Sequence, residues 1–519
     1  MPKLSRRRFL QTAAVATAAT QFAPHLRAET ATAAIPYPEN GTLIPDEGWH
    51  LWIDEHAAWQ NDDLFLPEEI SRDANGTMLG RGQPLPVNAP TGGWGVLRHD
   101  TGLEVTLPTT VEQHFWGQYG AGADGKPRPY TPDEYRYAAT TPPIAPADDA
   151  VPQNGAYFGV SWWHRPIEIP AEMRGKRILL HIRGARLRAE VYLNRQLVGY
   201  SIMEELPFEC DLTHAAKPGG KNMLVIRITN PFGRFDWVDG SNAKWGHLAL
   251  YRSHGFGGLD RGMTISAHKG IRVTDAWILN RPDNKSISCF ANIEFPSAHP
   301  NIAAVFEIID PSSGIVLAHS GGGYDVNLNG GVHPTYLNTL RPIHRDIEYA
   351  AVDVWDLDQP KLYHLRITAR AAGGTETDTR TIAFGFRSFA PEGLGTNAMF
   401  KLNGRRIRIY TAISWGYWGL NGLFPVPELA EKEVVAAKTL GLNCLSFHRN
   451  LAKEDVLRKH DQLGLLRYME PGAGKLAIGK LPAGAQTNAA GIIMEKPTSE
   501  ADKFAQRYMF TKCVEMVNM

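Results

Sequence analysis

Short stretches of alternating apolar and polar residues fill the middle of this chain and constrain its fold more than any other feature. Across residues 157–268 such runs, for example 177–183 and 222–228, are interrupted about every ten residues by Gly, Asn or Pro. Because strand side chains alternate between two faces, this pattern predicts antiparallel sheets packed as a sandwich or jelly roll. A second set of runs, across 271–386, approaches the strand number of an immunoglobulin-like sandwich.

The pattern changes near residue 390, where strands begin to alternate with helices. Three segments are predicted as strands and three as helices: residues 406–410, 442–447 and 465–469, and residues 427–440, 453–463 and 499–517. Strands that alternate with helices over mostly short loops predict parallel βαβ units, here the first three of a (β/α)8 barrel. Such a barrel takes about 250 residues. Only 119 residues follow position 400, so we expect an incomplete barrel.

The predicted fold class is therefore multidomain, β plus α/β. A chain of 519 residues is too long for one hydrophobic core, and the changes of pattern divide it into four segments. These are a signal peptide (1–33), an N-terminal arm with a jelly roll (34–270), an immunoglobulin-like sandwich (271–388) and a partial (β/α)8 barrel (389–519).

The N-terminus predicts export. Residues 5–10 read Ser-Arg-Arg-Arg-Phe-Leu and precede an uncharged stretch rich in Ala and Thr, with small residues near Ala28 and Ala33. These features are typical of a signal peptide, and the paired arginines resemble the twin-arginine signal. The apolar stretch is shorter than the roughly 20 residues of a membrane-spanning helix. We expect a periplasmic or secreted protein, exported by the twin-arginine machinery without a stable membrane anchor; a disordered basic tail is the alternative.

Charge and cysteine content limit the partners and cofactors that we expect for this protein. The 54 basic and 54 acidic residues balance, which argues against a nucleic-acid partner, because phosphate binding needs a cationic surplus or stripe. The four cysteines have no metal or redox spacing, and we expect no structural disulfide and no cofactor. They are Cys210, Cys289, Cys444 and Cys513. No residue is assigned as a metal ligand, and any metal requirement stays open.

Several motifs, in the right order, resemble family 2 glycoside hydrolases, the group containing β-galactosidases, β-glucuronidases and β-mannosidases. They lie at residues 162–165 (Trp-Trp-His-Arg), 191–194 (Val-Tyr-Leu-Asn), 207–213, 355–363, 385–387 and 400–404. Arg195 stands where the family's hairpin has a glycine, and residues 255–262 depart from the family's Gly-Ile-Tyr-Arg-Asp-Val segment. In that family a jelly roll and an immunoglobulin-like domain precede a catalytic barrel.

The resemblance implies hydrolysis of a terminal β-linked sugar with retention, which takes two carboxyl groups roughly 5 Å apart. In the family both are glutamates on later barrel strands, and the acid/base glutamate follows an asparagine. No Asn-Glu dipeptide occurs after residue 400, so the resemblance assigns no catalytic residue to this chain. We expect a glycosidase of which this portion is inactive by itself, and the sugar and linkage stay open.

Five residues are candidates for contacting a β-glycoside substrate: Trp415, Trp418, His448, Glu470 and Asp239. The first four follow predicted barrel strands, whose C-terminal ends carry the active site in such barrels. By resemblance His448 faces the sugar, Glu470 matches a frequent acidic residue and Asp239 lies in a loop that reaches the site. The two tryptophans offer faces for stacking on sugar. Alternatives stay open: a backbone-bonded histidine, a turn-capping acid, an Asp-Gly turn and ordinary loop packing.

Two other classes compete with a hydrolase. A non-catalytic carbohydrate-binding protein could be built on the same sandwiches, and a structural, adhesin-like array is a third interpretation. The alternating strands and helices after residue 400 argue against the array. A gene that continues past Met519 into an Asn-Glu strand would distinguish the hydrolase from the binding protein.

Overall fold

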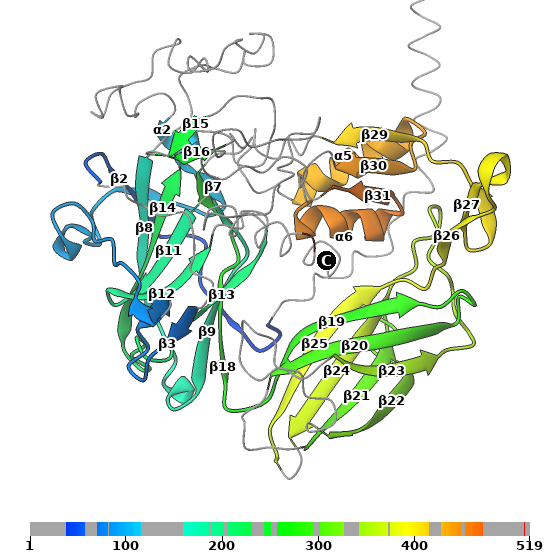
Figure 1. Ribbon diagram of the computed structural model, residues 1–519, viewed down its shortest axis with the longest axis horizontal. Coiled ribbons are helices and arrows are strands. Elements are labelled where there is room, and N and C mark those ends of the chain that lie inside the picture. Colours follow the sequence, from blue (N-terminus) through cyan, green and yellow to red (C-terminus); the bar gives the residue numbers. More distant parts are fainter. Residues whose placement is uncertain are drawn as a thin grey trace, which may run out of the picture.

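The computed structural model describes residues 38–57, 70–80, 82–115, 159–186, 188–201, 206–230, 243–245, 248–250, 257–294, 301–325, 342–371, 374–414, 427–447, 452–470 and 513. Over these residues the chain is mostly β-sheet with little helix, arranged in several units (Figure 1). This confirms the predicted multidomain, mainly β architecture. The four domain boundaries and the names jelly roll, immunoglobulin-like and (β/α)8 barrel stay predictions, and the predicted signal peptide lies outside the described residues.

The first unit packs two antiparallel sheets face to face. One has six strands in the order β12 (Gln196–Ser201), β11 (Arg188–Leu193), β14 (Lys221–Asn230), β8 (Gly159–Glu168), β2 (Trp49–Asp54) and β6 (Leu103–Val105). The other has four, in the order β1 (Thr42–Leu43), β18 (Thr264–His268), β9 (Arg177–Ile182) and β13 (Phe208–Asp211). Residues far apart in sequence thus become neighbours across one core.

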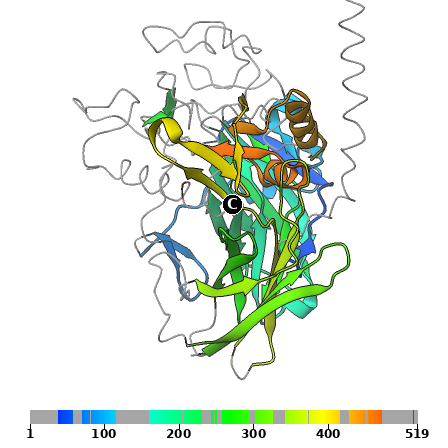
Figure 2. The ribbon, with the colours of Figure 1, turned by 90° about the vertical axis from the view of Figure 1, so that its right-hand side faces the viewer.

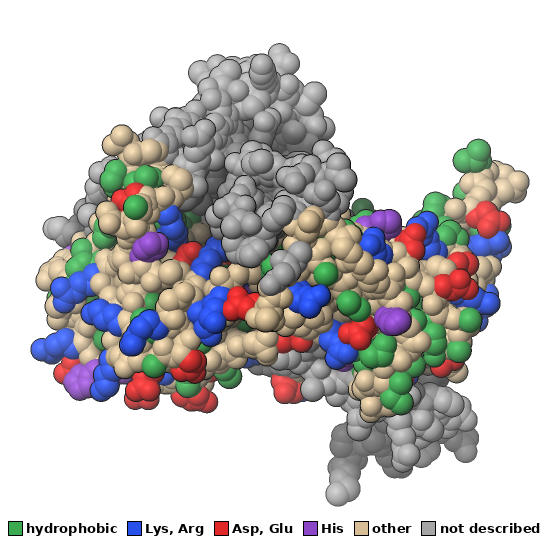
Figure 3. Space-filling model, turned by 90° about the horizontal axis from the view of Figure 1, so that it is seen from below, with side chains coloured by type: hydrophobic (Ala, Val, Ile, Leu, Met, Phe, Trp, Pro, Cys, Tyr) green, Lys and Arg blue, Asp and Glu red, His purple; other side chains and the backbone are tan. Residues whose placement is uncertain are grey.

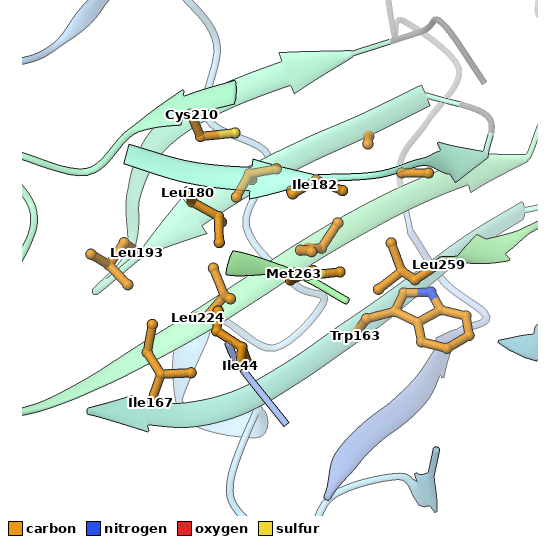
Figure 4. Close-up of a cluster of buried hydrophobic side chains, with 14 of the residues drawn as sticks. Ile44, Trp163, Ile167, Leu180, Ile182, Leu193, Cys210, Leu224, Leu259 and Met263 are labelled. Atoms are coloured by element: carbon orange, nitrogen blue, oxygen red, sulfur yellow. The ribbon is translucent and has the colours of Figure 1, made fainter. Parts of the chain in front are cut away.

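The core of this unit consists of the inward-facing side chains of both sheets (Figure 4). Trp163, Leu193 and Leu224 come from the six-stranded sheet, and Leu180 comes from β9. Each is fully buried, which contributes about 1.5–3 kcal/mol for a large apolar side chain. The sheets approach so closely at Gly199 that a Cβ there would lie 2.1 Å from the Cys210 sulfur.

The outer face of the six-stranded sheet is also covered. Trp162 and Tyr192 point to this side and are fully buried, and the ring of Trp94 packs edge-on against both. The covering segment contains β3 (Ile70–Arg72), β4 (Met78–Gly80), β5 (Gln83–Pro84) and η2 (Trp94–Val96). The alternation of Trp162 and Trp163 therefore places one indole in each of two cores.

Shorter elements complete this unit. They are β7 (Thr109–Thr110), β10 (Ala185–Arg186) and β17 (Gly258–Leu259), which form one small sheet, the pair β15 (Ala243–Trp245) and β16 (Leu248–Leu250), and the helices α2 (Val111–Phe115) and η4 (Ala171–Met173). Together with the two large sheets they account for the short runs separated by turns in the sequence.

The second unit is a smaller antiparallel sandwich. Its three-stranded sheet has the order β19 (Arg272–Asn280), β20 (Ser286–Glu294) and β23 (Ile343–Glu348). The facing sheet has the order β22 (Val316–Asp325), β21 (Asn301–Ile309), β24 (Tyr363–Ala371) and β25 (Thr377–Phe384). Val273, Ile287, Phe306 and Leu365 fill the core between them and are inaccessible to solvent.

The third unit begins with an antiparallel sheet and continues with parallel strands. The antiparallel strands are β26 (Phe389–Glu392), β27 (Met399–Leu402) and β28 (Arg405–Ile407), with η5 (Gly395–Asn397) between the first two. The parallel strands are β29 (Thr411–Ser414), β30 (Cys444–Phe447) and β31 (Leu466–Met469), joined through α5 (Pro427–Thr439) and α6 (Glu454–Leu463). Both helices lie on one side of this small sheet (Figure 2).

The sequence-based prediction was wrong at the start of this unit. A strand was predicted at 406–410, but residues 405–407 pair antiparallel with β27, and the first parallel strand begins at Thr411. The reason is the tight turn at Asn403 and Gly404, whose positive φ angles of 51° and 77° reverse the chain. The two following helices were predicted to within one residue at each end.

Charged side chains of both signs are interspersed on the face seen in Figure 3, in keeping with the zero net charge. Cys210, Cys289 and Cys444 are buried free thiols. No helix among the described residues is long and apolar enough to cross a membrane.

Candidate functional site

The three parallel strands end at a common edge. Ser414, Phe447 and Met469, the last residues of β29, β30 and β31, are paired across the sheet. Glu470 follows β31 directly and is half-buried at this edge. Because the residues that follow parallel strands leave the sheet at the same edge, we take this edge as the candidate functional site.

Only one of the five candidate residues can be placed. Glu470 lies at the predicted edge, whereas Trp415, Trp418, His448 and Asp239 lie outside the described residues. The structure therefore tests neither their roles nor their proximity, and all five assignments stay predictions.

Packing against α5 and α6 determines which face of the three parallel strands is buried. Phe447 is buried against Ala430 of α5 and against Val456 and Leu457 of α6. The alternate positions point to the opposite side of the sheet, where Ile413 and Tyr468 are 52% and 59% exposed in the described structure. The helices thus cover one face of the sheet, and on the other face the described side chains Ile413 and Tyr468 are exposed.

A carboxyl group that the sequence analysis did not single out lies behind this edge. The Ser414 hydroxyl donates a hydrogen bond of 2.7 Å to Oε1 of Glu433 on α5. Burial raises the pKa of Glu433, and its Oε2 atom is buried with no hydrogen-bond partner among the described residues. The available signal was its position three residues after Ala430 on the inward face of the helix. Glu433 fixes the end of β29 relative to α5.

A two-arginine clamp attaches this unit to the first sandwich. Asp455, in the first turn of α6, accepts a hydrogen bond of 3.0 Å from Arg183 and one of 2.7 Å from Arg261. The nearby carboxylates of Asp260 and Asp455 raise the pKa of Arg183, so it stays charged. A carboxylate at a helix N-terminus also interacts favourably with the helix dipole. Arg261 belongs to the segment that departs from the family pattern, and the clamp gives it a structural role.

A lysine attaches the same unit to the second sandwich. The Lys438 ammonium donates to the carbonyl oxygens of Leu463 and Gly464, at 2.7 and 3.1 Å, and to that of Leu357. The Trp355 indole also donates to the Asp461 carbonyl, at 2.7 Å. These contacts satisfy carbonyl groups at the C-terminal end of α6 that have no partner within the helix. Both sandwiches thus orient the parallel strands.

The chemistry that the described part of this edge offers rests on one carboxylate, that of Glu470. Among the described residues no three His, Cys, Asp or Glu side chains are grouped as metal ligands. What the edge offers is a carboxylate, Glu470, in a framework that α5 and α6 hold in place. Carboxylates placed at strand ends can accept hydrogen bonds from sugar hydroxyls.

The fold is that of family 2 glycoside hydrolases. A family 2 member from Bacteroides cellulosilyticus superposes with a TM-score of 0.57 over 82% of this chain and 45% of its own, at 16% identity. A β-glucuronidase from the same family gives a TM-score of 0.56 over 83% of this chain and 39% of its own, at 15% identity. These likenesses confirm the predicted resemblance at the level of the fold.

Sequence comparison agrees. The chain is 21% identical to a β-glucuronidase of Formosa agariphila over 51% of its length and 26% of the relative. It is 24% identical to a β-galactosidase of Thermoanaerobacter pseudethanolicus over 60% of its length and 39% of the relative. No family model matches the sequence. The chain therefore resembles family 2 glycosidases in sequence and fold while spanning well under half the length of these relatives.

Proposed function

We propose that the protein is a retaining β-glycoside hydrolase, to which this chain contributes a jelly roll, an immunoglobulin-like sandwich and the first units of a (β/α)8 barrel. The observation that carries the proposal is the common edge of β29–β31, with Glu470 at its rim, in a fold shared with family 2 enzymes. β-Glucuronides and β-galactosides are the first substrates to test, because the similar proteins carry those activities in their names.

The proposed mechanism divides the work between two parts of the protein. Retention needs an acid/base carboxyl group and a nucleophilic carboxylate roughly 5 Å apart. Since the chain spans 26% and 39% of two relatives, we place both in a part of the protein beyond this sequence. The residues of this chain position the sugar. Glu470 does so by hydrogen bonding, and His448, Asp239, Trp415 and Trp418 provide further contacts with the substrate.

The test starts with the gene. Reading it past the codon for Met519 should reveal an Asn-Glu dipeptide and a later glutamate, and the full product should hydrolyse nitrophenyl β-glycosides, unlike residues 34–519 alone. In the active protein Glu470→Gln should lower kcat/KM about tenfold to a hundredfold, because a hydrogen bond to a charged group is worth about 1.5–3 kcal/mol. The matched control is Glu428→Gln, on exposed helix surface.

The test of the full-length protein and the test of Glu470→Gln contradict different parts of the proposal. A full-length product with neither glutamate, which binds sugars without cleaving them, would replace the hydrolase with a carbohydrate-binding protein. Unchanged kcat/KM in Glu470→Gln would instead remove Glu470 from the substrate site and leave the hydrolase in place.

Export through the twin-arginine machinery is a further part of the proposal. Replacing Arg6 and Arg7 by lysine should stop export, because the machinery reads the arginine pair itself and not its charge. Immunoblots of periplasmic and cytoplasmic fractions measure this directly. The control replaces Arg8 by lysine, which keeps the pair. Export that continues unchanged in the double variant would contradict the assignment.

A further inference from the structure

Two hairpins of this chain use the same tight turn with different residues. Asn194 and Arg195 connect β11 to β12 with φ angles of 51° and 74°, and Asn403 and Gly404 connect β27 to β28 with φ angles of 51° and 77°. Both are two-residue turns in which each central residue has positive φ, a conformation that favours Asn followed by Gly. Glycine adopts it freely and asparagine tolerates it, whereas a long side chain such as that of arginine is strained there. Arg195 therefore occupies a glycine position at a conformational cost.

The two asparagines make equivalent hydrogen bonds, so they do not explain why the second turn residue is arginine in one hairpin and glycine in the other. Asn194 donates to the Ala215 carbonyl at 2.8 Å and accepts from the Met223 amide at 3.0 Å. Asn403 likewise donates to a backbone carbonyl, at 2.9 Å, and accepts from a backbone amide, at 3.0 Å. Since both turns are anchored through their first residue, a glycine would serve equally well at position 195. A strained residue where strain is avoidable points to a use for its side chain.

Arg195 lines a hollow on the outer side of the first sandwich. The hollow has a volume of about 360 Å³ and lies between the β11–β12 hairpin and the segment β4–β5. Its lining residues are Thr77, Met78, Leu85, Val87, Asn194, Arg195, Gln196 and Leu197. Ligand pockets typically measure about 300–1,000 Å³, so this one suits a single sugar-sized group.

Hydrogen bonds join the two segments that border the hollow. Gln196 donates to the Asn75 carbonyl at 3.3 Å, and Arg72 donates to the Val198 carbonyl. Figure 1 shows β3 lying beside β12, away from the parallel strands β29–β31. The hollow is thus separate from the candidate site at the barrel edge.

The chemistry of the lining combines apolar surface with one cation. Met78 and Leu197 are each 7% exposed, and Leu85 and Val87 extend the apolar wall. Arg195 is the one charged residue among the described lining residues; its side chain is exposed, and the described structure gives it no carboxylate partner. A guanidinium pairs with a carboxylate through two parallel hydrogen bonds. The C–H face of a pyranose ring suits an apolar wall.

We propose that this hollow is an accessory binding site for a carboxylate-bearing saccharide, with Arg195 pairing with the carboxylate of a uronic acid. The site lies outside the proposed hydrolytic centre and does not depend on it. It would hold an acidic glycan on the first sandwich whichever β-glycoside the barrel cleaves.

The test compares two ligands that differ in one group. Methyl β-D-glucuronide should bind the protein about tenfold more tightly than methyl β-D-glucoside, in which a hydroxymethyl group replaces the carboxylate. Affinities are measured by NMR titration of the mature chain and of the full-length protein. Equal affinity for the two ligands would overturn the proposal. N-acetylglutamate methylamide provides a third arm: binding as tight as that of the glucuronide would make the ligand an acidic peptide and reject the saccharide.

The decisive variant is Arg195→Gly, which should remove the proposed binding site without lowering the stability of the protein. Arg195→Gly relieves the strained turn, so the thermal midpoint should stay at or above that of the wild type, while glucuronide affinity falls about tenfold. Arg195→Lys keeps the charge and loses the two parallel hydrogen bonds, so its glucuronide affinity should lie between those of the wild type and of Arg195→Gly. Arg98→Ala, which removes an exposed arginine elsewhere, is the matched control and should bind normally.

These variants separate the hollow from the barrel edge. Glucuronide binding that survives in Arg195→Gly and disappears in Glu470→Gln belongs to the barrel edge and rejects the hollow as a site. Binding that depends on Arg195 and is unchanged by Glu470→Gln supports it, even if the protein hydrolyses no glycoside.

Discussion

The free energy of unfolding should fall steeply as the pH is lowered from about 6.5 to about 4, because two buried histidines and a third, partly buried one stay neutral in the folded protein. Burial lowers the pKa of His164, His268 and His460 from 6.5 to about 4 in each case. Below pH 6.5 the unfolded chain binds protons that the folded chain excludes until the pH approaches 4. Stability from these groups is complete above pH 6.5 and is lost on acidification through this window.

The surroundings of each histidine explain its low pKa. His164 makes one hydrogen bond of 3.0 Å, from Nε2 to the Thr101 carbonyl, and stacks on His50. His460 is fully buried against Phe447 and lies near Arg467, which opposes a second positive charge. In both cases the protonated ring would exchange water for apolar or cationic neighbours.

His268 lies in a more charged setting. Burial is the largest cause of its low pKa; Arg272 and Arg177 lower the pKa further, whereas the Glu209 carboxylate raises it. Asp378 lies 3.8 Å from its Nδ1 atom. Depressed acid pKa values at Glu209 and Asp211 act in the same direction at lower pH, because protonating those carboxylates also favours unfolding.

The expected magnitude is large. One pKa unit corresponds to about 1.36 kcal/mol, so each histidine contributes on the order of 3 kcal/mol between pH 7 and pH 4. Urea unfolding at several pH values measures the slope. His460→Leu should reduce that slope by about one proton, while the exposed His99→Ala should leave it unchanged. A free energy of unfolding that is flat between pH 7 and pH 5 would show that these rings are protonated at little cost.

What the sequence could predict follows from how local each signal is. The helix α5 was located because its proline, apolar face and terminal glycine lie within fifteen residues. The first parallel strand was misplaced because a turn at Asn403 and Gly404 redirects a segment whose composition is equally strand-like on either side. Local patterns therefore predicted the elements and their order better than their partners.

The long-range contacts of the site had no such signal. Asp455 and Arg261 are 194 residues apart, and their pairing depends on how two separate units meet. Neither could be matched from sequence, because each is an ordinary charged residue on its own element. The position of Glu470 directly after β31 followed from the predicted strand at 465–469, whereas its role at a substrate site stays a prediction. Glu433 was missed because an acid within a helix usually faces solvent.

The junction between the two sandwiches should be the most sensitive point for a single substitution. Arg272, 7% exposed, donates to Glu209 at 2.6 Å and to Glu294 at 2.9 Å. Glu294 also pairs with Arg177 at 2.8 Å, and Glu209 with His181 at 3.0 Å. The network joins β9 and β13 of the first sandwich to β19 and β20 of the second, so a change at its centre affects both.

Arg272→Met should lower the free energy of unfolding by about 3–5 kcal/mol, the usual cost of removing one partner from a buried ionic network. Most of this cost comes from the two carboxylates left behind, so adding Glu209→Gln should recover part of it. Chemical denaturation followed by tryptophan fluorescence measures all variants. The control, Arg366→Ala, breaks a more exposed pair with Glu307 and should cost below about 1 kcal/mol. If the double variant is less stable than Arg272→Met, stranded charge is not the cause, and the methylene packing of Arg272 is what joins the sandwiches.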